Sequence, residues 1–187
     1  MTPAAGDNAP GLPQPASVLP HRPPFLFVDE LTALEPGRSA RGVWRLTGEE
    51  AFFQGHFPGR PTLPGVLMVE AMAQLGGIAV LSDARFTGYL PLFGGIDKAR
   101  FRRQVVPGDT LEIAVELDQL GAMAGKGHGP ASVEGRLAAT ASLLFVMVRP
   151  CPRRVIRAPL VQAFTPRPPA VYQNVAERSS WRLTLGK

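Results

Sequence analysis

His56 and Glu70 are the two side chains in this sequence best suited to acid–base chemistry. His56 lies in a segment rich in glycine and proline, and Glu70 follows fourteen residues later in an apolar stretch. An imidazole titrates near neutral pH and can accept a proton. A carboxyl group buried among apolar side chains holds its proton more tightly and can donate it. The pair therefore predicts removal of a proton beside a carbonyl together with expulsion of a hydroxyl.

Three further residues could support this chemistry. Pro64 and Gly65 precede the apolar stretch, so the N–H groups of Gly65 and Val66 should lack partners at the start of a helix. Such donors stabilise a thioester oxygen that gains negative charge. Gln74 lies one helical turn after Glu70 and could orient its carboxylate. A loop histidine is often only a surface residue, whereas a glutamate buried without a purpose is costly.

The elements that must position these residues can be predicted from patterning. Residues 50–65 hold three prolines and three glycines and predict a loop, and residues 66–84 predict a helix that is apolar on nearly every side. Strands are expected at 38–46, 93–106, 110–120 and 131–148, with residues 121–130 as a loop. Residues 25–28 suit a first strand or a docking segment. The pattern indicates an α+β fold in which an antiparallel sheet curls around one helix.

Composition divides the chain into three parts. Residues 1–17 are rich in proline, alanine and glycine and predict disorder, residues 18–148 predict the folded domain, and residues 149–187 form a basic, proline-rich extension. The extension has eight basic residues and one acidic residue, which gives a charge of +7, whereas residues 1–148 carry 12 basic and 14 acidic residues. The basicity therefore belongs to the tail, and the folded domain is not expected to bind nucleic acid.

Cysteine content and hydropathy bear on the compartment. The sequence has one cysteine, Cys151, and its N-terminus lacks the basic start and apolar run of a signal peptide. The longest apolar stretch contains Glu70 and Gln74, which favours a core helix over a membrane span. We expect a soluble cytoplasmic protein without a membrane segment.

The segment from His56 to Gln74, HFPGRPTLPGVLMVEAMAQ, closely resembles the signature of the bacterial 3-hydroxyacyl-[acyl-carrier-protein] dehydratases, which have the hot-dog fold. Further similarity lies in LPHRPPF (19–25), GIDKARFRR (95–103) and VPGD (106–109), so the resemblance covers residues 18–148.

The resemblance implies a specific mechanism. The histidine corresponding to His56 removes the C2 proton, the glutamate corresponding to Glu70 protonates the 3-hydroxyl, and an amide at Gly65 or Val66 binds the thioester oxygen. The expected substrate is a (3R)-3-hydroxyacyl group on the phosphopantetheine arm of an acyl carrier protein, in fatty-acid or polyketide-type biosynthesis. The two side chains come from different subunits of a homodimer, with a trimer of dimers as the larger alternative. No metal or redox cofactor is implied.

Other positions are expected to shape or approach the site. The family often has a tyrosine gating the acyl tunnel where this sequence has Leu92, beside Phe93, which puts tunnel shape in question. Lys98, Arg100, Arg102 and Arg103 could attract an acidic carrier protein. His21 reads as structural and His128 as solvated.

Two other functions remain open. A hot-dog thioesterase would need a carboxylate that activates water, and the spacing of His56 and Glu70 disfavours it. A non-catalytic acyl-binding partner subunit is the alternative from a different class; the presence of both His56 and Glu70 counts against it, and the unusual tail keeps it open.

Overall fold

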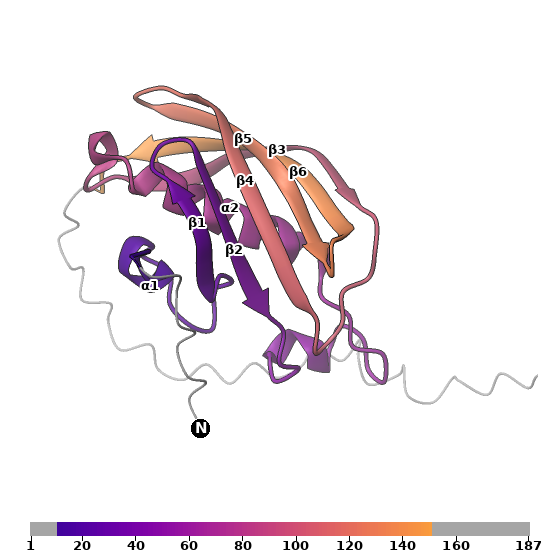
Figure 1. The fold of residues 1–187 in the computed structure, drawn as a ribbon. Coiled ribbons are helices and arrows are strands. Elements are labelled where there is room, and N and C mark those ends of the chain that lie inside the picture. Colours follow the sequence, from indigo (N-terminus) through magenta and orange to yellow (C-terminus); the bar gives the residue numbers. More distant parts are fainter. Residues whose placement is uncertain (1–10, 151–187) are drawn as a thin grey trace, which may run out of the picture. The chain divides into compact units, whose positions relative to one another are not determined.

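A computed structural model describes residues 11–150 of the chain. Its six strands form one antiparallel sheet in the order β1-β2-β4-β5-β6-β3, and Figure 1 shows this sheet curving around the helix α2. The elements in chain order are α1 (Pro15–Val18), β1 (Glu30–Glu35), β2 (Ser39–Arg45), η1 (Ala51–Gln54), α2 (Gly65–Leu81), η2 (Ala84–Phe86), β3 (Leu90–Phe101), β4 (Thr110–Leu120), β5 (Ala124–Val133) and β6 (Arg136–Val148). The predicted hot-dog fold is confirmed.

The helix α2 is the centre of the core because the sheet surrounds it. Leu75 and Ile78 are fully buried, and the helix contacts β2, β3, β4, β5 and β6. Gly76 permits the closest approach, since a Cβ atom there would lie 2.6 Å from the ring of Phe145 on β6. An apolar helix without a solvent face therefore fits this position.

Most of the predicted elements are present. The helix occupies Gly65–Leu81, and β4 has the predicted bounds Thr110–Leu120, with alternate side chains buried along its first half. β3 begins at Leu90 and ends at Phe101, somewhat before the predicted 93–106. Residues 25–28 form no strand; Phe27 and Val28 are buried instead, which agrees with the docking alternative.

The prediction of a loop at residues 121–130 is wrong, because β5 runs from Ala124 to Val133. Its glycines 125, 127 and 129 occupy the inward-facing positions. A Cβ atom at Gly127 would lie 2.9 Å from the Glu116 carbonyl oxygen, and one at Gly129 would overlap the Ala114 carbonyl oxygen. The glycines therefore allow close approach to β4 rather than marking a turn.

The ends of the domain differ in part from expectation. The one-turn helix α1, with Pro15 buried, begins within the last three residues of the segment 1–17 predicted to be disordered, so order begins earlier than expected. The predictions for residues 1–10 and for the extension from residue 151 onward lie outside the described residues. No helix among residues 11–150 is both long and apolar enough to cross a membrane.

The strand β3 forms an exposed edge of the sheet. Among residues 11–150 it pairs only with β6, and its large apolar side chains Leu92, Phe93, Ile96 and Phe101 are between 41% and 55% exposed. A long, apolar edge strand is a template for pairing with another chain.

Candidate active site

Glu70 lies in the second turn of α2, with its side chain half-buried. Its Oε1 accepts a hydrogen bond of 3.0 Å from the Nε2 of Gln74, so the contact expected from their spacing is present. The carboxylate is therefore held in one orientation by a residue on the same face of the helix.

Gln74 is itself fixed by the N-terminal segment. Its Oε1 accepts a hydrogen bond of 2.8 Å from the Phe27 N–H, and its Nε2 also donates to the Phe25 carbonyl at 3.2 Å. Gln74 is only 2% exposed, and these bonds satisfy both ends of its amide. The path of residues 25–27 and the orientation of Glu70 are thus connected through one side chain.

A small apolar cavity of about 170 Å³ opens beside Glu70. Leu92 and Phe93 of β3 line it together with Gln74, so these three predicted binding residues lie at the same cavity as Glu70. The remaining lining residues come from the N-terminal segment, α2, β3 and β6: Leu19, His21, Ala73, Gly77, Pro91 and Phe145. The walls are suited to a hydrocarbon chain ending near a carboxyl group.

His56 is held by the loop that follows η1. Its Nδ1 lies 2.7 Å from the Thr62 carbonyl oxygen, and the Thr62 N–H donates back to the His56 carbonyl at 2.8 Å. Because a carbonyl oxygen only accepts, Nδ1 carries the hydrogen in this contact and donates it. The Nε2 of the neutral ring then has a free lone pair, as a general base requires.

A second cavity, of about 550 Å³, joins His56 to the start of α2. Gly65 and Val66 line it, and no acceptor among residues 11–150 binds the N–H of either residue. A Cβ atom at Gly65 would approach the Phe101 ring to 2.9 Å, so the ring packs closely against the helix start. The helix N-terminus thus presents free donors to the cavity that contains the imidazole.

His56 and Glu70 line different cavities of the single chain, and neither cavity contains both side chains. Each cavity is bordered by exposed apolar residues of the edge strand β3, namely Leu92 and Phe93 beside Glu70 and Phe101 beside His56. The two predicted catalytic groups are therefore both next to the strand that is open to a second chain.

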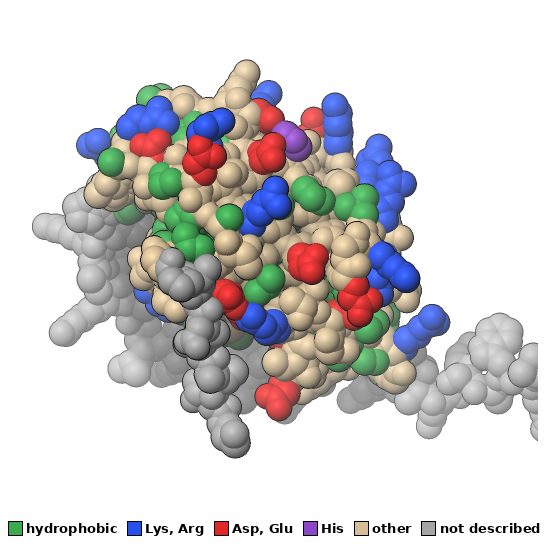
Figure 2. All heavy atoms as spheres, viewed as in Figure 1, with side chains coloured by type: hydrophobic (Ala, Val, Ile, Leu, Met, Phe, Trp, Pro, Cys, Tyr) green, Lys and Arg blue, Asp and Glu red, His purple; other side chains and the backbone are tan. Residues whose placement is uncertain are grey.

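The four predicted docking residues lie at the end of β3 and just beyond it. Arg102 and Arg103 line the His56 cavity, whereas Lys98 and Arg100 are exposed on the strand without lining it. The opposite charges on the face shown in Figure 2 are interspersed, so this face has no continuous basic surface for nucleic acid.

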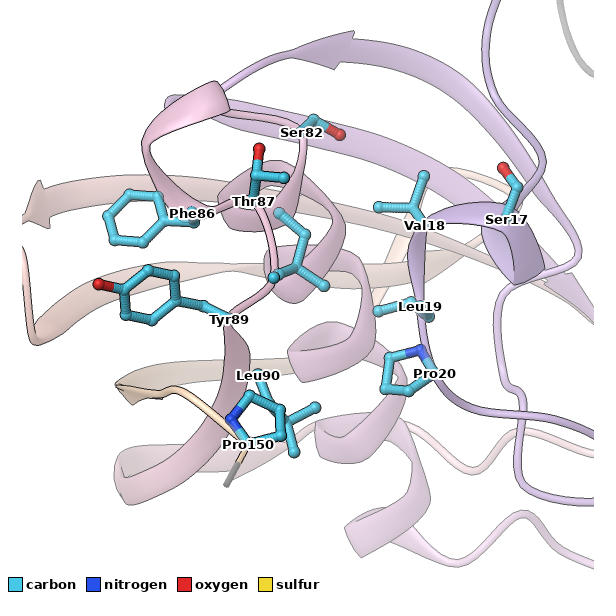
Figure 3. A pocket seen from close by; sticks show the side chains of 12 residues that line it. Ser17, Val18, Leu19, Pro20, Ser82, Phe86, Thr87, Tyr89, Leu90 and Pro150 are labelled. Atoms are coloured by element: carbon cyan, nitrogen blue, oxygen red, sulfur yellow. The ribbon is translucent and has the colours of Figure 1, made fainter. Parts of the chain in front are cut away.

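A third cavity, of about 610 Å³, lies at the C-terminal end of α2. Figure 3 shows Val18, Leu19 and Pro20 on one side of it and Tyr89, Leu90 and Pro150 on the other. Leu19 also lines the Glu70 cavity, so the two cavities are neighbours along the N-terminal segment.

His21 is the residue that sequence reasoning undervalued. Its Nε2 lies 3.8 Å from the Glu70 Oε1, and the two side chains line the same cavity. The signal in the sequence that could have indicated a role for His21 was its place in the LPHRPPF motif. The sequence separation of residues 21 and 70 does not predict that they are in contact. Among the described residues, no group of three His, Cys, Asp or Glu side chains is arranged to hold a metal ion.

Comparisons with known proteins identify the family of this chain. Residues 19–142 match the FabA-like domain. The chain is 52% identical over 130 residues to the 3-hydroxyacyl-[acyl-carrier-protein] dehydratase FabZ of Clostridium botulinum strain Kyoto, covering 70% of this chain and 90% of that protein. It is 53% identical over 130 residues to the FabZ of Pelotomaculum thermopropionicum, covering 70% of this chain and 93% of that protein.

Solved structures share the fold at low identity. The dehydratase heterocomplex ApeI:P from Xenorhabdus doucetiae superposes with a TM-score of 0.63 at 18% identity, covering 78% of this chain and 97% of that chain. A hypothetical thioesterase from Streptococcus pneumoniae with coenzyme A has a TM-score of 0.51 at 12% identity, covering 64% of this chain and 85% of that chain. These two likenesses bear on the fold alone.

Proposed function

The chain belongs to the family of FabA-like 3-hydroxyacyl-[acyl-carrier-protein] dehydratases, and from this we propose that it reversibly dehydrates a (3R)-3-hydroxyacyl thioester on an acyl carrier protein to the trans-2-enoyl thioester in fatty-acid biosynthesis. The proposal rests on this close similarity together with two side chains that are oriented for acid–base chemistry. The His56 imidazole donates from Nδ1 and leaves Nε2 available, and the Glu70 carboxyl group is oriented by Gln74.

The reaction divides the proton transfers between two residues. His56 Nε2 takes the proton from C2, and the electron pair of that C–H bond forms the C2–C3 double bond as the C3–O bond breaks. Glu70 gives its proton to the departing oxygen, which leaves as water. The N–H groups of Gly65 and Val66 donate to the thioester oxygen, where negative charge develops. Loss of the proton from His56 and reprotonation of Glu70 restore the starting state.

The active site is proposed to form between two chains. His56 and Glu70 lie at separate cavities of one chain, and the open edge β3 borders both. Pairing two β3 strands about a twofold axis would join the two sheets and bring the His56 cavity of one chain to the Glu70 cavity of its partner. The proposed unit is a homodimer, with a trimer of dimers as the larger assembly.

The acyl chain is proposed to follow the apolar cavity beside Glu70. Leu92 and Phe93 form one wall, and Gly77 adds no side chain to the floor. Leu19 lines both this cavity and the third one, which offers room for longer acyl chains. An apolar leucine at position 92 does not donate a hydrogen bond as a tyrosine would, so we expect it to restrict the entrance by size alone.

The carrier protein is proposed to dock near the end of β3. Arg102 and Arg103 lie at the mouth of the His56 cavity, where the phosphopantetheine arm would enter, and Lys98 and Arg100 extend the same charge along the strand. Cationic side chains at this rim would steer an acidic partner. A cytoplasmic location is part of the proposal and follows from the single cysteine.

The test is to incubate the purified chain with a 3-hydroxyacyl-carrier thioester and follow loss of one water by mass spectrometry. Glu70→Gln and His56→Ala should each lower turnover about 100- to 10,000-fold, as expected for a positioned acid or base. Glu116→Gln and His128→Ala are matched controls, because both side chains are exposed away from the cavities, and should leave turnover unchanged. A wild-type chain that produces no enoyl thioester would refute the proposed function.

A further inference from the structure

We propose that His21 is a positioning residue for Glu70, holding the carboxyl group so that one chosen oxygen carries the proton given to the substrate. The inference rests on the proposed function and assigns to the N-terminal segment a part in the dehydration step. It concerns a histidine that is distinct from the proposed base, His56.

The ring of His21 is directed at the carboxylate by its surroundings. Its Nε2 lies 3.8 Å from the Glu70 Oε1, and the two side chains are 29% and 19% exposed. The ring stacks on Phe25 with centroids 6.4 Å apart. Arg22 fixes the turn, since its Nη1 donates to the Leu19 carbonyl at 2.8 Å and to the His21 carbonyl at 2.6 Å.

The other ring nitrogen determines which tautomer suits this site. Within residues 11–150, the His21 Nδ1 is buried and has no hydrogen-bond partner. A buried N–H without an acceptor costs more than a buried lone pair without a donor, so the hydrogen belongs on Nε2. The Nε2–H group then points at Glu70. A separation of 3.8 Å is longer than a hydrogen bond, and such contacts often shorten when substrate binds.

Both donors near the carboxyl group address the same oxygen. Gln74 donates to Oε1, and His21 faces Oε1 as well. An oxygen that accepts one N–H group and faces a second is a poorer site for a proton than the other oxygen, so the proton belongs on Oε2, which has no donor among the described residues. When Oε2 gives this proton to the leaving hydroxyl, the charge that remains on the carboxylate is stabilised at Oε1 by both residues.

The experiment separates this role from a purely structural one by changing the leaving group. Elimination of water from a 3-hydroxybutyryl thioester requires a proton on the departing oxygen. Elimination of chloride from the 3-chlorobutyryl thioester breaks the C3–Cl bond with release of Cl⁻ and needs only the base, His56. Glu70→Gln is the reference for lost acid function, and uncatalysed elimination is subtracted.

His21→Leu should lower kcat on the 3-hydroxy thioester about 10- to 100-fold, the loss of a hydrogen bond to a charged group, with little change in KM. It should leave elimination of chloride close to wild type, as is also expected of Glu70→Gln. His21→Gln, whose amide nitrogen can occupy the place of Nε2, should retain most activity on both substrates. His21→Asn keeps the polarity but is one carbon shorter, so it should resemble His21→Leu and provides a second comparison if the leucine variant misfolds.

Equal losses on both substrates, equal activities of the Gln and Asn variants, or full activity of His21→Leu would each overturn the inference. A wild-type chain that eliminates neither leaving group would instead count against the proposed function, so the two failures are distinguishable. Dimer content and melting temperature of every variant, compared with wild type, show whether the protein is folded.

Discussion

Two inactive variants should restore one another's activity when their chains share a dimer. His56→Ala removes the proposed base and Glu70→Gln removes the proposed acid, and the two side chains line separate cavities of the single chain. If each site takes His56 from one chain and Glu70 from its partner, a mixed dimer has one site with both changes and one site with neither.

The size of the restored activity follows from this geometry. At equal amounts of the two chains, random pairing makes about half of the dimers mixed, and each mixed dimer has one intact site of two. Turnover should therefore reach about one quarter of that of the same amount of wild-type chain. If both residues of a site came from one chain, no dimer would contain an intact site.

A second mixture gives an independent number. A chain with both changes, mixed with wild type, leaves both sites of the mixed dimer incomplete, so only wild-type dimers turn over, at about one quarter of the all-wild-type value. Sites built within one chain would instead retain about one half, since every wild-type chain would keep its own site.

The assay is co-expression of the two variants with different affinity tags and purification through both tags in turn. If the assembly is a single dimer, this isolates mixed dimers, whose turnover on a 3-hydroxyacyl thioester should be about one half of wild type. In a trimer of dimers nearly every particle carries both tags, so the value should stay at about one quarter. Co-purification in equal amounts proves that the chains have paired. No recovered turnover in such a preparation, or one half in the wild-type mixture, refutes the proposed two-chain site.

Three further outcomes are expected. Gly129→Ala should lower the free energy of unfolding by about 1–3 kcal/mol in chemical denaturation, because the new Cβ overlaps the Ala114 carbonyl oxygen. Gly55→Ala is the control and should not lower it, since Gly55 has open space around it. Equal stabilities of the two variants would contradict the packing argument. Burial raises the pKa of Asp29 above its ordinary 3.8, so ionisation of this group costs the folded chain stability as pH rises. The stability of Asp29→Asn relative to wild type, measured by denaturation, should therefore grow as pH rises from about 4, and a constant difference would count against it. Ending the chain after Pro150 should leave turnover on a small soluble thioester unchanged, because β6 ends at Val148 and the family match ends at residue 142. Weaker binding of carrier-linked substrate by the shortened chain would support docking by the extension. Loss of folding would instead place the extension within the domain.

The sequence allowed the helix and most strands to be predicted because their patterns reflect burial directly. The apolar run after Gly65 favoured a buried helix because it contains Glu70 and Gln74, and alternation at 110–120 matches a strand with one buried face. The strand β5 was missed because glycines at inward-facing positions look like a flexible loop when the neighbouring strand is not known. The composition of a strand does not show that its backbone lies close to the backbone of a neighbouring strand.

Long-range contacts explain what was missed at the site. The spacing of Glu70 and Gln74 within one helix predicted their hydrogen bond, since residues four apart lie on one face. The contact of His21 with Glu70 spans forty-nine positions and depends on how the N-terminal segment crosses α2. The separation of His56 from Glu70 into two cavities was expected only from the family resemblance, because it depends on the path of the loop before the helix, which periodicity does not describe.

We expect Gln74 to determine the order of events when the protein is heated. Residues 25–27 belong to no strand, and the amide of Gln74 connects their backbone to the Glu70 carboxylate: its Oε1 accepts from the Phe27 N–H, and its Nε2 donates to the Phe25 carbonyl and to Glu70. A local opening of this short segment should release Glu70 while the helix and sheet remain folded. Thermal inactivation should consequently precede the cooperative melting of the domain, and amide hydrogen exchange at Phe27 should report the loss of catalytic competence before any change in secondary structure.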